Sequence, residues 1–62
     1  MEKLARLEYY VLKDLEFKGY TRIKSTAALF IYEYESILYF FDKTPKNMNS
    51  LNMNKLLHIK EK

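Results

Sequence analysis

Apolar residues recur at helical spacing in the first third of the chain. They would form one stripe along a helix, with charged residues over much of the remaining circumference. The members of this stripe are Leu4, Leu7, Val11, Leu12 and Leu15. The only glycine, Gly19, follows at the place where a left-handed backbone would end the helix. The pattern therefore predicts an amphipathic helix from about Glu2 to Lys18, closed by an apolar contact between Leu15 and Tyr20.

Residues 20 to 41 are rich in β-branched and aromatic side chains, which favour strands. Short polar breaks divide this run, and we interpret the segments 20–24, 29–34 and 37–41 as three antiparallel strands. Neither break contains the Asn-Gly or Asp-Gly pair that marks a tight hairpin. Residues 27 to 41 also fit a helical stripe, which would give a three-helix, all-α protein. Strands are favoured because these residue types lose side-chain freedom in a helix.

A two-residue turn between the last two predicted strands would assign their side chains to two faces. One face would carry Leu29, Ile31, Leu38 and Phe40; the other would carry Phe30, Tyr32, Ile37, Tyr39 and Phe41. Both faces are apolar, and the first helix can cover only one of them. The second face is left to the C-terminal segment, to a second copy of the chain or to a different partner.

The C-terminal part of the chain begins at Thr44-Pro45, which ends the last strand. Residues 44 to 50 are rich in Asn, and we interpret them as a linker. A short helix is predicted from about Ser50 to Lys60. The expected fold is α+β: a single domain over residues 1–62 with an N-terminal helix, a three-stranded antiparallel sheet and a short C-terminal helix.

Composition narrows the class of protein. The 62 residues include 11 Lys and Arg against 8 Asp and Glu, one His and no Cys. Without Cys the chain has no disulfide and no thiolate ligand, so no metal and no cofactor are expected. The sequence shows no signal peptide and no apolar run near the ~20 residues of a membrane span, so a cytoplasmic protein without a membrane partner is expected.

Candidate catalytic groups are sparse. His58 stands between Leu57 and Ile59, and the carboxylate pair Glu33 and Glu35 is typical of a solvated hairpin end. No Gly-rich loop is present to hold a phosphate. The sequence therefore predicts a protein that is not an enzyme and has no small-molecule substrate.

Basic and aromatic side chains alternate at Tyr20, Arg22 and Lys24, beside the Tyr-rich face of the predicted hairpin. This combination occurs both at protein interfaces and on surfaces that bind single-stranded nucleic acid. The nearby carboxylates would repel phosphate, so a protein partner is favoured. The residues expected to bind it are Tyr20, Arg22, Lys24, Phe30, Tyr32, Tyr34 and Tyr39.

The function expected from these features is that of a small non-catalytic interaction protein, an inhibitor or adaptor such as phages and mobile elements encode. It would bind a larger protein partner, and self-association as a homodimer is a further expectation. The alternative is a nucleic-acid-binding module. Its phosphate contacts would come from Arg22, Lys24, Lys43, Lys46 and Lys55.

Overall fold

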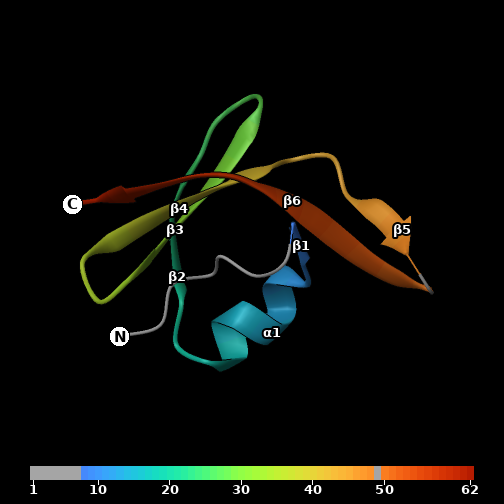
Figure 1. Ribbon diagram of the computed structural model, residues 1–62, viewed down its shortest axis with the longest axis horizontal. Helices are drawn as coiled ribbons and strands as arrows, with labels where there is room; N and C mark the ends of the chain where they lie inside the picture. The colour runs from blue at the N-terminus through green and yellow to red at the C-terminus, as the bar shows by residue number, and fades with distance from the viewer. Residues whose placement is uncertain (1–7, 49) are drawn as a thin grey trace.

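The computed structural model describes residues 8–48 and 50–62, and it is mostly β structure (Figure 1). Six strands form an antiparallel sheet in the order β1-β6-β4-β3-β2, with β5 also paired to β6. One helix lies against one side of this twisted sheet. In chain order the elements are β1 (Tyr9–Tyr10), α1 (Leu12–Phe17), β2 (Thr21–Ser25), β3 (Leu29–Tyr34), β4 (Ile37–Asp42), β5 (Lys46–Met48) and β6 (Leu51–Glu61). In the described part of the chain, no helix is long and apolar enough to span a membrane.

The predicted fold class is wrong. The sheet has six strands, not three, and the described residues form one short helix, which contradicts both the α+β prediction and the all-α alternative. The predicted C-terminal helix from Ser50 to Lys60 is in fact β6. This strand pairs with its sequence neighbour β5 and with β1 and β4, which are distant in sequence, so most of its pairing is invisible to local preferences. Residues 46–48, inside the predicted linker, form β5.

The predicted N-terminal helix is much shorter than its apolar stripe suggests. Residues 1–7 lie outside the described part, and Tyr9 and Tyr10 pair with Lys55 and Asn54 as β1. The ring of Tyr10 packs edge-on against Phe41, with centroids 6.1 Å apart. The aromatic pair favours a strand once β6 offers it an edge. Within the described part of the chain, helical structure therefore begins at α1.

The end of α1 confirms the role predicted for Gly19. Its backbone φ is +108°, which is the left-handed half of conformational space. The N–H of Gly19 donates to the carbonyl of Glu16 at 3.1 Å, and the N–H of Tyr20 donates to the carbonyl of Leu15 at 3.0 Å. These two bonds define a Schellman motif. The side chains of Leu15 and Tyr20 are both buried in the same core cluster, as the cap predicts.

The three segments predicted as strands in the middle of the chain are present as β2, β3 and β4. Tyr34 pairs with Ile37, so Glu35 and Ser36 form a two-residue turn with φ of 51° and 66°. Positive φ at both positions is the geometry of the type I′ turns that fit the twist of a hairpin. The register confirms both predicted faces and rules out the helical interpretation of residues 27 to 41.

The core lies between α1 and one face of the sheet. It consists mainly of aromatic rings packed edge to face, such as Tyr32 on Phe41 at 5.6 Å and Tyr20 on Tyr39 at 5.4 Å between centroids. The buried apolar side chains are Tyr10, Leu15, Tyr20, Tyr32, Ile37, Tyr39 and Phe41. Four of these seven residues are tyrosines, so the core also has to accommodate hydroxyl groups.

Replacing Gly19 tests the helix cap. Gly19→Ala should lower the free energy of unfolding by about 1 kcal/mol, because a Cβ is penalised at positive φ. The new Cβ would itself meet only Tyr34, at 3.5 Å, so the loss would report the backbone and not a steric clash. Lys18→Ala, at the preceding position with φ of −84°, is the matched control. Chemical denaturation followed by circular dichroism measures both; equal stability of the two variants would contradict the cap.

Replacing Ser36 tests the turn between β3 and β4. Ser36→Gly should raise the free energy of unfolding by about 1 kcal/mol, because glycine adopts positive φ without the cost that a Cβ imposes. Ser25→Gly makes the same chemical change at an exposed β2 position without positive φ, and it should destabilise the protein. Thermal or chemical denaturation measures both variants. A gain of stability in Ser36→Gly with a loss in Ser25→Gly supports the turn, whereas a loss of stability in both variants would count against it.

Candidate functional site

One face of the β3–β4 hairpin is apolar but is not the face that α1 covers. We call it the open face, and its centre is formed by Leu29, Ile31, Leu38 and Phe40, all half-buried. Ile31 pairs with Phe40 at the middle of this face, while Leu38 pairs with Glu33 and Leu29 pairs with Asp42. The open face is thus an apolar strip on a sheet whose core is built on the opposite side.

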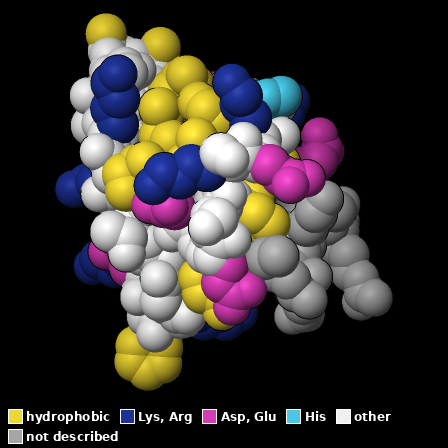
Figure 2. All heavy atoms as spheres, turned by 90° about the vertical axis from the view of Figure 1, so that its left-hand side faces the viewer, with side chains coloured by type: hydrophobic (Ala, Val, Ile, Leu, Met, Phe, Trp, Pro, Cys, Tyr) yellow, Lys and Arg dark blue, Asp and Glu magenta, His cyan; other side chains and the backbone are white. Residues whose placement is uncertain are grey.

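Basic groups border the open face. Lys24 pairs with Ile31 across β2 and β3, and on β6 His58 and Lys60 pair with Phe40 and Leu38. The ring of His58 lies 5.5 Å from that of Phe40. Figure 2 shows hydrophobic side chains gathered between Lys or Arg side chains, with the histidine at their border.

The acidic groups near the open face are already engaged. Glu33 Oε2 accepts a hydrogen bond from Lys62 Nζ at 2.9 Å, and Asp42 Oδ1 accepts one from the N–H of Thr44 at 2.9 Å. Among the described residues neither Lys24 nor Lys60 forms an ion pair. The border of the open face therefore has a positive character.

Two bulges place further apolar side chains at the surface. The pairing of β2 with β3 shifts between Arg22 and Lys24, and Ile23 between them is 46% exposed. The pairing of β4 with β6 shifts at Phe40 and Phe41, where Leu57 is the extra residue of β6 and is 49% exposed. The sequence contains no clear signal for either bulge, because a bulge depends on the partner strand.

The aromatic residues predicted to bind a partner belong mostly to the core. Tyr20, Tyr32 and Tyr39 have exposed fractions of 8%, 1% and 0%. Tyr34 is half-buried and stacks on Tyr20 with centroids 4.4 Å apart. Phe30 is also half-buried, at the edge of the core cluster. These rings are largely turned toward α1, so the aromatic face of the hairpin is the covered face.

The basic residues of the predicted sites are exposed or half-buried, and they are dispersed over the surface. The bulge at Ile23 breaks the expected alternation, so Arg22 pairs with Tyr32 while Lys24 pairs with Ile31 on the opposite face. The structure therefore separates two cations that the sequence places side by side.

Two of the five cations of the nucleic-acid alternative lie against the same aromatic ring. Arg22 and Lys43 lie 5.1 Å and 5.3 Å from the centroid of the Phe30 ring. Lys46 is exposed on β5, and Lys55 on β6 lies 4.0 Å from the carboxylate of Glu8. The five residues predicted for nucleic-acid binding thus do not form one surface.

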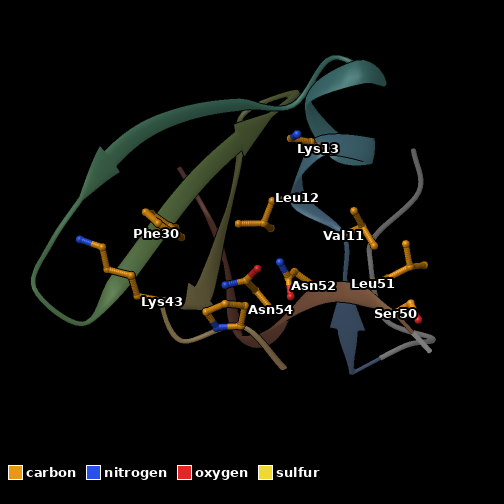
Figure 3. Close-up of a pocket in the computed structure, with 10 residues that line it drawn as sticks. Val11, Leu12, Lys13, Phe30, Lys43, Ser50, Leu51, Asn52 and Asn54 are labelled. Carbon is orange, nitrogen blue, oxygen red and sulfur yellow. The ribbon is translucent and has the colours of Figure 1, made fainter. Parts of the chain in front are cut away.

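A groove lies on the covered side of the sheet, between the start of α1 and the β5–β6 hairpin (Figure 3). Its volume is about 520 Å³. Most of its walls are apolar, two asparagines stand on β6, and two lysines lie at its rim. The lining residues are Val11, Leu12, Lys13, Phe30, Lys43, Pro45, Ser50, Leu51, Asn52 and Asn54. Sequence reasoning did not find this site, because it is assembled by β6 pairing.

Other chemically active groups are scattered. Glu33 is on β3 and paired with Lys62, whereas Glu35 is in the turn, so they do not act as a carboxylate pair. Within residues 8–48 and 50–62, no three His, Cys, Asp or Glu side chains lie close enough together to hold a metal ion. The open face and the groove are therefore the two surfaces with a defined chemical character.

The hydroxyl of Tyr32 is the polar group that ties the core to α1. It donates a hydrogen bond of 2.6 Å to Glu16 Oε2. Burial, and then this bond to a carboxylate, raise the pKa of Tyr32 to about 12, against the ordinary value of 10.0. Burial likewise raises the pKa of Tyr39, although the nearby Tyr20 side chain opposes part of that change. Both phenols are thus held in the neutral form.

The raised pKa of Tyr32 predicts a loss of stability in alkaline solution. The folded state favours the neutral phenol, so its contribution is complete below pH 10 and is lost as the pH rises through about 12. Tyr32→Phe should lower the free energy of unfolding at neutral pH by about 1 to 2 kcal/mol and flatten the alkaline decline. Glu16→Gln keeps a hydrogen-bond acceptor and should lower the free energy of unfolding by less than Tyr32→Phe does. Denaturation against pH measures all three proteins; an equally steep decline in Tyr32→Phe would contradict this role.

Comparison with known proteins leaves the chain without a match among family models, curated protein sequences and solved structures. The proposals for its function therefore rest on the open face and the groove.

Proposed function

We propose that this chain is a non-catalytic interaction protein that binds a larger protein partner through the open face. The observation that carries this proposal is a row of four half-buried apolar side chains on the face of the hairpin that α1 does not cover. Binding of a partner to an apolar sheet face is favourable, because it removes apolar surface from water. Ile23 and Leu57, which are exposed at the two bulges, are further apolar side chains that a partner could bury.

The border of the open face supports a partner with acidic residues around an apolar centre. Lys24, His58 and Lys60 pair with apolar residues of the open face, while Glu33 is already engaged by Lys62. Charges at the rim of an interface mainly steer association and select partners, whereas the apolar centre provides most of the affinity. Of the residues predicted for the partner site, Lys24 is the one on the open face.

Phe40 is the best anchor residue on the open face. It is a large aromatic side chain near the middle of the strip, flanked by Ile31 on β3 and by His58 on β6. Aromatic anchors at the centre of an interface often account for much of its binding free energy. A charge placed beside this anchor should therefore prevent docking without entering the core.

Ile31→Glu tests the open face. The substitution places a carboxylate at the centre of the strip and should abolish capture of the partner from a lysate of the source cells, while the fold remains intact by circular dichroism. Phe17→Ser is the matched control, because Phe17 is a large apolar residue that is 94% exposed at the end of α1. Cross-linking and mass spectrometry identify what each protein captures.

The outcomes of this experiment are distinct. Capture of the same protein by the wild type and by Phe17→Ser, with loss in Ile31→Glu, supports the proposal. Equal capture by all three proteins overturns it. Sedimentation shows whether the partner is a second copy of the chain. Recovery of RNA or DNA, with binding that weakens steeply as salt rises, would favour the nucleic-acid alternative instead.

A further inference from the structure

We propose that the groove binds a small amphipathic monocarboxylate of the fatty-acid type, with its tail between α1 and β6 and its carboxylate at the lysine-bearing rim. This site lies on the covered side of the sheet and is separate from the open face. Its volume of about 520 Å³ falls in the range of pockets that bind small molecules.

The apolar part of the groove matches an alkyl tail. In Figure 3, Leu12 stands in the middle, Phe30 lies toward one end, and Val11 and Leu51 lie toward the other. Pro45 completes the apolar lining. Leu51 is 53% exposed, so a tail lying on it would bury apolar surface that now faces water.

The charged groups among the described lining residues of the groove all have one sign. These groups are Lys13 on α1 and Lys43 after β4, and none of the described lining residues is a carboxylate. Lys43 Nζ is held by the carbonyl of Thr26 at 2.8 Å and lies 5.3 Å from the Phe30 centroid. An ammonium has three donors, so this fixed group can still donate to an anion. Charge complementarity therefore selects a carboxylate over an alcohol or an amine.

The two asparagines give the groove a polar wall of fixed shape. Asn54 is 6% exposed, and its amide Nδ2 donates to the carbonyl of Asp42 at 2.8 Å. This bond joins β6 to the chain where it leaves β4. Asn52 stands beside Asn54, and both side chains face Leu12 across the groove in Figure 3. This hydrogen bond from a buried asparagine thus braces one wall of the groove.

A chain-length and headgroup series tests the proposal. The full chain is titrated with octanoate, decanoate, octanol and octylamine below their micellar concentrations, and binding is followed by calorimetry and by backbone amide shifts. Decanoate should bind more tightly than octanoate, by about fourfold for each additional methylene that is buried. Octanol should bind more weakly than octanoate, and octylamine should show no saturable binding. The largest shifts should occur at Leu12, Leu51 and Asn52.

Variants locate the site. Leu51→Ser removes a wall of the tail region and should weaken octanoate binding several-fold. Lys13→Met and Lys43→Met should each weaken it by about twofold to fivefold, the scale of a solvent-exposed ion pair. Lys60→Met is the matched control, because Lys60 is an exposed lysine that pairs with Leu38 of the open face. It should bind octanoate as the wild type does.

Three results would overturn the proposal: octylamine binding as tightly as octanoate, shifts confined to the open face, or an equal loss of affinity in Lys60→Met. Absence of saturable binding by any member of the series would overturn it as well. The binding of a protein partner by the open face is tested separately, by Ile31→Glu and by capture from a lysate.

Discussion

The register of β3 against β4 is the constraint on which the rest of the structure depends. Side chains on a strand alternate between faces, so a slip of one residue would exchange the two apolar sets of the hairpin. The turn at Glu35 and Ser36 fixes the pairing of Tyr34 with Ile37 and thereby directs Tyr32, Tyr39 and Phe41 toward α1. The same register leaves Ile31 and Phe40 on the side that α1 does not cover. Core and candidate interface are therefore assigned together by a single two-residue turn.

The covered face of the hairpin is lined by aromatic side chains, and α1 is too short to fill the space above it with its own side chains. A helix of six residues contributes one fully buried side chain, Leu15, so the rings must fill the space between strand and helix themselves. Edge-to-face packing lets them do so, but the tyrosines bring hydroxyl groups into the buried core, where each needs a hydrogen-bond partner. Tyr32 resolves this by donating a hydrogen bond to Glu16. The bond between Tyr32 and Glu16 thus adds a polar contact to the packing of Leu15 between α1 and the sheet.

Local chemistry could be predicted from the sequence, and long-range pairing could not. The helix end at Gly19 and the two faces of the hairpin follow from backbone preferences and from the period of a strand, and both are confirmed. β6 could not be found in this way, because a chain segment containing Asn52 and Asn54 has a weak preference for any structure until β1, β4 and β5 offer it hydrogen bonds. The same pairing places Tyr9 and Tyr10 in a strand instead of the predicted helix. The groove was missed for that reason. Four of the aromatic residues predicted to bind a partner, Phe30, Tyr32, Tyr34 and Tyr39, lie on the covered face of the hairpin.

The two candidate surfaces differ in how they are connected to the fold. The open face is made by residues that lie outside the buried core cluster. The groove shares Leu12 and Phe30 with the edge of the core, and Asn54 braces it through Asp42. A ligand that binds only the folded groove must stabilise the whole chain through mass action. In a protein with so small a core, occupancy of the groove would therefore act on stability first, and the open face would be affected only through the fold that both surfaces share.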